Sequence, residues 1–221
     1  SMREVTQKHI YFIRHAETAG NRALKNQHPH DTLTVRGRRQ ACAVAKCMEA
    51  RDVTALYTSD YTRARETATV IGELLELPYT VTPSVRETVF PASLQEKSMF
   101  HIDSIAYLLN LFRFAGDAHY NNGGAENVYD IRQRVLDTRR MLETESADTV
   151  AVVSHSLFIN LFCALVCDDG ACGATELLWR MVWLKRLPNA GYVHLTYDPD
   201  ATAKQCTWQR HGVYTAASCT V

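Results

Sequence analysis

The stretch His9-Ile-Tyr-Phe-Ile-Arg-His15 is a short, nearly unbroken apolar run that ends in an arginine and a histidine. So short an apolar run is typical of a β-strand that is buried on both faces. The small and polar residues 16–21 that follow predict the end of this strand. In open α/β sheets, ligands bind at the carboxyl ends of the strands. We therefore expect Arg14 and His15 to lie at a ligand site on one edge of a buried sheet.

The composition favours a globular protein without a strong overall charge. The chain has 221 residues, of which 46% are hydrophobic, so it can bury a substantial core. Its 24 Lys and Arg residues balance its 24 Asp and Glu residues, and no apolar run is long enough to cross a membrane. The sequence therefore predicts neither a nucleic-acid partner nor a membrane partner, and it leaves the oligomeric state open. No signal peptide is recognisable, and we expect a cytoplasmic protein.

The seven cysteines do not show the tight spacing of a disulfide framework. We expect them to be reduced and mostly buried thiols, as in cytosolic proteins. Cys163, Cys167 and Cys172 could instead bind zinc, but their spacing matches no familiar ligand pattern. The sequence therefore predicts no metal site.

Strand-like and helix-like segments alternate along most of the chain. Predicted strands cover residues 9–15, 53–59, 79–85, 149–154, 192–197 and 206–210, and predicted helices cover 31–50, 62–77, 126–145, 156–166 and 175–185. Thr34 or Asp31 would cap the first of these helices, and Asp60 the second. This alternation predicts an α/β fold of three layers, α/β/α, with a mostly parallel central sheet.

Residues 90–123 interrupt the alternation with an apolar segment that has helical spacing. We expect one domain, residues 1–221, in which this segment forms a small helical cap insertion over the edge of the sheet. Ile105, Leu108, Leu109 and Phe112 would pack against the domain. An ordinary core helix is the alternative.

Several polar side chains follow the predicted strands and should meet at one edge of the sheet. Arg14 and His15 end the first strand, Arg63 follows the second, Glu87 follows the third and His155 ends the strand at 149–154. Guanidinium groups bind phosphate in a bidentate manner, and helix N-termini add backbone donors for an anion. A neutral imidazole can accept a phosphoryl group. This set of residues indicates a phosphate site.

At this point the chain resembles the histidine phosphatase superfamily, also called phosphoglycerate mutase-like. The resemblance rests on five blocks in the family's order: Arg14-His15-Ala-Glu17-Thr18-Ala-Gly-Asn21, Leu33-Thr34-x-x-Gly37-x-x-Gln40-Ala41, Thr58-Ser59-Asp60-x-x-Arg63-Ala64-x-Glu66-Thr67-Ala68, Gly124-Ala-Glu126 and Val152-Val153-Ser154-His155. Glu87 stands where the family has its acid. The blocks cover most of the chain outside residues 88–122.

The resemblance implies a role for each of these residues. His15 would be the nucleophile, neutral and with its second ring nitrogen bonded to a backbone carbonyl. Arg14 and Arg63 would clamp the phosphoryl oxygens, and His155 would donate to them as an imidazolium. Glu87 would protonate the leaving alcohol and then deprotonate water. Arginines would lower the pKa of Glu87 and burial would raise it, and the sequence does not decide between them.

Two further positions belong to the expected site. Asn21 would add a neutral hydrogen bond to the substrate, and Ser156 replaces the glycine that usually follows the second histidine. Glu17 is expected to be structural, and Arg65 to lie on the surface. The glycine- and tryptophan-containing stretch that often follows the acid is absent. Because of this departure the sequence does not identify the substrate, whereas the expected phosphoryl-transfer chemistry is unaffected.

The expected function is phosphomonoester hydrolysis through a phosphohistidine intermediate, on a small phosphorylated molecule and without a cofactor. A phosphoglycerate mutase is the alternative within the family, but it needs more cationic contacts than Lys97 and Arg113 of the insertion supply. A protein phosphatase and a non-catalytic phosphate-binding module of the same fold also remain open.

Overall fold

The structure, a computed structural model, contains one six-stranded sheet with strand order β3-β2-β4-β1-β5-β6. Strands β1–β4 pair in parallel, and β5 and β6 are added antiparallel at one edge. The strands are β1 (Lys8–Arg14), β2 (Ala55–Thr58), β3 (Tyr79–Val81), β4 (Thr149–Ser154), β5 (Tyr192–Tyr197) and β6 (Trp208–Tyr214). The structure describes residues 7–23, 25–89, 91–94, 97–98, 100–114, 117, 119–120, 124–168, 177, 187–201 and 206–219.

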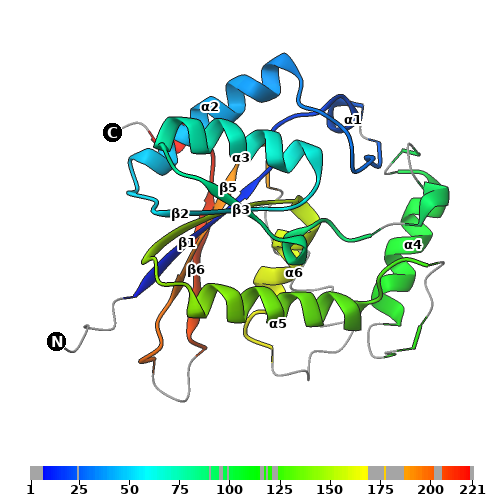
Figure 1. Cartoon of the computed structure of the whole chain (residues 1–221). Helices are drawn as coiled ribbons and strands as arrows, with labels where there is room; N and C mark the ends of the chain where they lie inside the picture. The colour runs from blue at the N-terminus through cyan, green and yellow to red at the C-terminus, as the bar shows by residue number, and fades with distance from the viewer. Residues whose placement is uncertain are drawn as a thin grey trace.

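Helices cover both faces of this sheet, as Figure 1 shows. The helices are α1 (Ala19–Arg22), α2 (Val35–Glu49), α3 (Thr62–Leu75), α4 (Ile102–Arg113), α5 (Val128–Thr144) and α6 (Ser156–Leu165). Ile10 and Phe12 of β1 pack in a cluster with α5 and α6, whereas Tyr11 and Ile13 pack in a second cluster with α2 and α3. The predicted three-layer fold with a mostly parallel sheet is thus confirmed. No helix of the described part of the chain is both long and apolar enough to cross a membrane.

The two helices on the α2 and α3 face begin differently. Thr34 caps α2, because its hydroxyl oxygen accepts a hydrogen bond from the backbone N–H of Gly37 at 2.9 Å. The predicted cap at Asp60 is wrong, since α3 has Tyr61 at this position and no side-chain cap. The Asp60 carboxylate instead pairs with the guanidinium of Arg86 at 2.7 Å.

Some element boundaries also differ from the prediction. The expected strand 79–85 ends at Val81, and Pro83–Val85 form a 3₁₀ turn, because proline cannot donate a ladder hydrogen bond. The last strand begins at Trp208 and continues to Tyr214. The predicted helix 175–185 lies outside the described residues, apart from Leu177.

Helix α4 lies within the predicted insertion and beside the layers, on the side of α1 (Figure 1). The prediction of which side of α4 packs against the domain is wrong. Ile105 and Leu109 are 40% and 60% exposed, whereas Tyr107 and Leu111 are buried. Apolar residues occupy several faces of this helix, so their spacing alone did not select one face. The side chain of Phe112 lies outside the described set.

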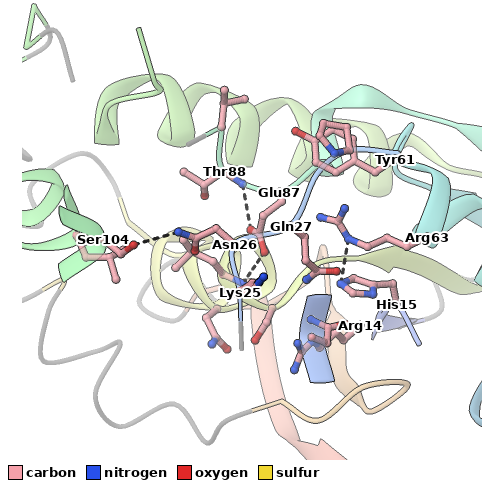
Figure 2. A pocket seen from close by; sticks show the side chains of 17 residues that line it. Arg14, His15, Lys25, Asn26, Gln27, Tyr61, Arg63, Glu87, Thr88 and Ser104 are labelled. Atoms are coloured by element: carbon pink, nitrogen blue, oxygen red, sulfur yellow. Dashed lines mark hydrogen bonds between the residues drawn. The ribbon is translucent and has the colours of Figure 1, made fainter. Parts of the chain in front are cut away.

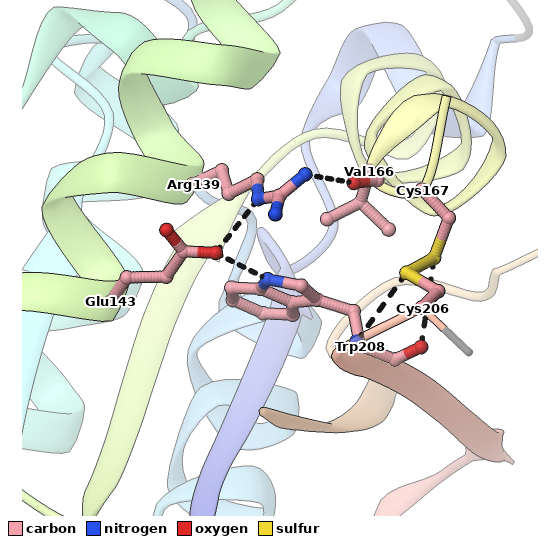
Figure 3. The surroundings of a disulfide bond; sticks show 6 residues. All are labelled: Arg139, Glu143, Val166, Cys167, Cys206 and Trp208. Carbon is pink, nitrogen blue, oxygen red and sulfur yellow. Dashed lines mark hydrogen bonds and ion pairs between the residues drawn. A yellow bond between two sulfur atoms is a disulfide. The ribbon is translucent and has the colours of Figure 1, made fainter. Parts of the chain in front are cut away.

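The expectation of reduced thiols is wrong for Cys47, Cys167 and Cys206, whereas Cys42 and Cys163 are free. Cys167 and Cys206 form a disulfide that joins the end of α6 to the start of β6 (Figure 3), and Cys47 is disulfide-bonded as well. The zinc alternative fails because Cys167 is already bonded to another cysteine. Next to the disulfide, the indole N–H of Trp208 donates to Glu143 at 2.9 Å. Sequence spacing cannot reveal such a long-range pairing.

Candidate active site

A cavity of about 340 Å³ opens at the carboxyl ends of the central strands. Figure 2 shows its lining. The expected site residues Arg14, His15, Asn21, Arg63, Glu87 and Ser156 line it, together with Lys25, Asn26, Gln27, Pro29, Tyr61, Thr88, Val89, Ser104, Leu108, Leu157 and Asn160. Its volume is within the range of small-molecule sites. The sheet topology therefore brings together residues that are distant in the sequence.

His15 follows β1 and is 2% exposed. Its Nδ1 lies 2.8 Å from the carbonyl oxygen of Ala16, so Nδ1 carries the proton and Nε2 has a lone pair. Arg63 donates its Nε–H to this Nε2 at 3.2 Å. Burial first, and then Arg63 and Arg14, hold the pKa of His15 well below its usual value. The ring is therefore neutral and has a nucleophilic nitrogen in the cavity.

Two arginines flank this nitrogen. Arg63 lies in the first turn of α3, and its Nη1 donates to the carbonyl oxygen of His28 at 2.9 Å. The Tyr61 ring lies beneath the guanidinium, 5.0 Å from its central carbon, in a cation–π arrangement. Arg14 donates from Nη1 to the carbonyl oxygen of Leu187 at 2.7 Å. Backbone carbonyls thus fix two cations beside His15, as an anion site requires.

His155 follows β4, and its ring centroid lies 5.1 Å from that of His15. Its Nε2 lies 2.9 Å from the hydroxyl of Ser59, whereas its buried Nδ1 has no hydrogen-bond partner among the described residues. The expected imidazolium is wrong for the ligand-free protein, because burial, and then Arg63 and His15, hold the pKa of His155 well below its usual value. If Ser59 donates to Nε2, Nδ1–H is the unused donor of the ring, although His155 is fully buried and does not itself line the cavity.

Glu87 lies in the loop after β3 and is held by backbone donors. Its Oε1 accepts from the N–H groups of Thr88 at 3.0 Å and Phe158 at 2.9 Å, and its Oε2 accepts from Leu157 at 3.3 Å. Burial raises the pKa of Glu87, although these N–H groups and Arg63 oppose the increase. The structure thus indicates that the pKa of Glu87 is raised, a direction that the sequence left open. A raised pKa suits a carboxyl group that donates a proton.

Asn21 is oriented by a residue that the sequence analysis missed. Asn189 donates from Nδ2 to the Oδ1 of Asn21 at 2.9 Å and to the carbonyl oxygen of His15 at 3.2 Å. The backbone N–H of Thr18 also points to this Oδ1. Since the oxygen of Asn21 is occupied, its NH₂ group is the donor that remains for a ligand. Asn189 lies just before β5, where no strand end signalled a polar site.

Two other expectations concern residues around the cavity. Glu17 accepts a hydrogen bond from the Thr34 hydroxyl at 2.9 Å and pairs with Arg36 at 3.3 Å, so it ties the loop after β1 to α2. Arg65 is exposed. Both observations agree with the structural and surface roles that were expected. Among the residues that the structure describes, no group of three or more His, Cys, Asp or Glu side chains could hold a metal ion.

The chain is similar to curated bacterial proteins over part of its length. It is 28% identical over 142 residues to a glucosyl-3-phosphoglycerate phosphatase of Mycolicibacterium vanbaalenii, a match that covers 64% of this chain and 62% of the relative. It is 37% identical over 79 residues to a "Probable phosphoglycerate mutase" of Serratia proteamaculans, which covers 35% of this chain and 37% of that relative. The matches therefore span less than two thirds of these relatives.

Solved structures resemble the chain over nearly its whole length. A mycobacterial glucosyl-3-phosphoglycerate phosphatase in complex with VO3 has a TM-score of 0.72 at 23% identity, covering 94% of this chain and 98% of that one. A phosphoserine phosphatase variant from Entamoeba histolytica, in complex with phosphoserine, has a TM-score of 0.71 at 17% identity, covering 95% and 98%. At these identities the likeness shows a shared fold. The family model covers residues 10–208, and the chain belongs to the histidine phosphatase superfamily (branch 1).

Proposed function

We propose that the protein hydrolyses phosphomonoesters of small molecules through a phosphohistidine at His15. The observation that carries this proposal is the state of His15: it is buried and neutral, with Nδ1 bonded to Ala16 and Nε2 beside Arg63 in the cavity. A neutral imidazole between two arginines can attack a phosphoryl group once the Nε–H of Arg63 turns from the His15 Nε2 to a phosphoryl oxygen. The curated and structural relatives that are named phosphatases support the same reaction.

The reaction would proceed in two displacements. In the first, the Nε2 lone pair of His15 attacks phosphorus, the bond to the ester oxygen breaks, and Glu87 gives its proton to the leaving alcohol. Arg14, Arg63 and the Nδ1–H of His155 would hold the phosphoryl oxygens as charge spreads over them. In the second, the Glu87 carboxylate takes a proton from water, whose oxygen attacks phosphorus and releases phosphate and neutral His15.

The cavity favours a phosphatase over a mutase. A mutase must hold a second phosphate while the first is transferred, which needs further cations. Among the described residues that line the cavity, Lys25 is the remaining cation once Arg14 and Arg63 are assigned to the transferred phosphoryl group. We therefore infer that the substrate carries one phosphate.

Two broader expectations remain proposals. The first is a single domain with residues 90–123 as its cap, and the hydrogen bond between Asn26 and Ser104 of α4 at 3.0 Å supports it. The second is a cytoplasmic location, against which the disulfide between Cys167 and Cys206 counts, because disulfides persist mainly in oxidising compartments. Titration of thiols in the denatured, unreduced protein would test the disulfide directly.

The proposed function is tested by replacing His15 with alanine. Wild-type protein should release phosphate from p-nitrophenyl phosphate and form a phosphoenzyme that is stable to base and labile to acid. His15→Ala should lose both properties and keep the circular dichroism spectrum of the wild type. His30→Ala is the matched control, because His30 is exposed and does not line the cavity. Comparable phosphate release by well-folded His15→Ala protein would refute the assignment.

A further inference from the structure

The cavity has two chemically different ends, which Glu87 separates in Figure 2. Arg14, His15 and Arg63 lie on one side of this carboxyl group, where we place the phosphoryl group. Asn26, Thr88 and Ser104 lie on the other side, towards α4. Leu108 belongs to α4 itself, and the carbonyl oxygen of Val89 accepts a hydrogen bond from Tyr107 of α4. We call these five uncharged lining residues the alcohol subsite: Asn26, Thr88, Val89, Ser104 and Leu108. If Glu87 protonates the ester oxygen, the rest of the leaving alcohol must lie in this subsite.

Thr88 is the unexplained residue of the alcohol subsite. It lines the cavity and is only 1% exposed, yet its hydroxyl has no hydrogen-bond partner among the described residues. A buried polar atom without a partner is destabilising, so native proteins rarely keep one without a purpose. The missing partner is readily supplied by a bound molecule.

The position of Thr88 next to the acid determines which part of the substrate it can reach. Its backbone N–H donates to the Oε1 of Glu87 at 3.0 Å. A general acid must come within about 3 Å of the oxygen that it protonates. Figure 2 shows Thr88 on the side of Glu87 that faces away from Arg14 and Arg63. We therefore place its hydroxyl near the first carbons beyond the ester oxygen, rather than near the phosphate.

Asn26 offers a second polar group in the same subsite. Its amide nitrogen donates to the carbonyl oxygen of Leu94 at 2.9 Å and to the Ser104 hydroxyl at 3.0 Å. Ser104 in turn donates to the carbonyl oxygen of Ser98 at 3.0 Å. These bonds use both N–H groups of the Asn26 amide and fix its orientation, so its Oδ1 is the group that can accept from a ligand.

We propose that Thr88 is a specificity-determining residue that hydrogen-bonds a hydroxyl group of the leaving alcohol. The substrate class is then the phosphate monoesters of uncharged alcohols that carry at least one further hydroxyl close to the ester. This inference rests on the proposed function. The alcohol subsite agrees with it, because its five residues are uncharged, and the one further cation among the described lining residues, Lys25, is too few for a second phosphate.

The test compares glycerol 1-phosphate with n-propyl phosphate, which has the same ester but lacks the further hydroxyl groups. The wild type should prefer glycerol 1-phosphate in kcat/KM by about ten-fold or more, because a site built around a hydroxyl rejects an analogue without one. Thr88→Val keeps the shape and removes the hydroxyl, and it should lower this ratio several-fold, roughly by the loss of one hydrogen bond. Thr32→Val, at an exposed position outside the cavity, should keep the wild-type ratio.

Thermal unfolding gives a second readout. Because the hydroxyl lacks a partner in the ligand-free protein, Thr88→Val should have a Tm equal to or above that of the wild type. A lower Tm, an unchanged substrate ratio in Thr88→Val, or no preference in the wild type would overturn the assignment of Thr88. If wild-type protein hydrolyses neither ester and also leaves p-nitrophenyl phosphate intact, the proposed phosphatase activity itself fails.

Discussion

Replacing Glu87 with glutamine separates proton transfer from positioning in the proposed reaction. The carbonyl oxygen of glutamine can keep the two bonds that Oε1 accepts from Thr88 and Phe158, but its NH₂ group would face the N–H of Leu157. Losing that bond costs about 1–3 kcal/mol. Glutamine carries no charge, and this offsets part of the cost. Burial disfavours the ionised form of the Glu87 carboxyl group and raises its pKa, so a neutral side chain is better accommodated there. We expect the free energy of unfolding to change by about 1 kcal/mol or less.

The catalytic effect should be much larger and should depend on the leaving group. General acid catalysis contributes about 10²- to 10⁴-fold, which corresponds to roughly 3–5 kcal/mol of transition-state stabilisation. An alkyl phosphate needs this proton, because an alkoxide is a poor leaving group. p-Nitrophenyl phosphate does not need it, because its leaving group is stable as an anion. Glu87→Gln should therefore slow the alkyl ester by two orders of magnitude or more, and the nitrophenyl ester by less than about ten-fold.

The assay measures kcat/KM for both esters, with Glu17→Gln as the matched control. Glu17 is a buried carboxylate close to His15 in the chain, but it pairs with Arg36 and does not line the cavity. Its variant should change both esters by the same factor. Equal losses on the two esters in Glu87→Gln would refute proton donation and leave Glu87 as a positioning group. Unimpaired hydrolysis of both would exclude it from the reaction.

Four further predictions concern Ser59, Gly37, the buried histidines and the removal of metal ions. Ser59→Ala removes the partner of the His155 Nε2 and should lower kcat by about ten-fold, with weaker inhibition by inorganic phosphate. Gly37→Ala would press a Cβ against the backbone after β1 and should destabilise the fold by about 1–3 kcal/mol, seen as a lower Tm. Burial and neighbouring His211 lower the pKa of His194 from 6.5 to about 4, and those of His15 and His155 are also low. The unfolded chain then binds more protons, so stability should fall as pH decreases from 6.5 towards 4, and less steeply in His194→Gln. Activity should persist in EDTA, and a loss that Mg²⁺ or Zn²⁺ restores would contradict the proposed mechanism.

The sequence predicted the features that depend on local pattern and parallel topology. The apolar runs that become β1 and β4 are adjacent and parallel, and the N–H of His15 donates to the carbonyl oxygen of Ser154 at 2.9 Å. His15 and His155, which directly follow these two strands, must therefore meet. Arg63 was predicted for a similar reason, because it lies in the first turn of the helix that follows β2.

Other features depend on contacts that no local pattern encodes. Asn189 orients Asn21 across 168 positions of the chain, and Cys167 pairs with Cys206 across 39. The buried face of α4 could not be chosen because apolar residues lie on several of its faces. The neutral state of His155 in the ligand-free protein was not predicted, because its pKa depends on burial and on Arg63, and neither is visible in a strand-end motif.

Helix α6 connects the two halves of the proposed chemistry. His155 directly precedes this helix, and the backbone N–H groups of Leu157 and Phe158 in its first turn hold Glu87. One rigid element thus fixes the proposed donor to the phosphoryl group, His155, and the proposed proton donor to the leaving alcohol, Glu87, relative to each other. By contrast, the alcohol subsite is joined to α4 by one hydrogen bond between the side chains of Asn26 and Ser104. We expect substitutions there to change the preferred alcohol while the geometry of phosphoryl transfer is retained, as for folds that serve several substrates.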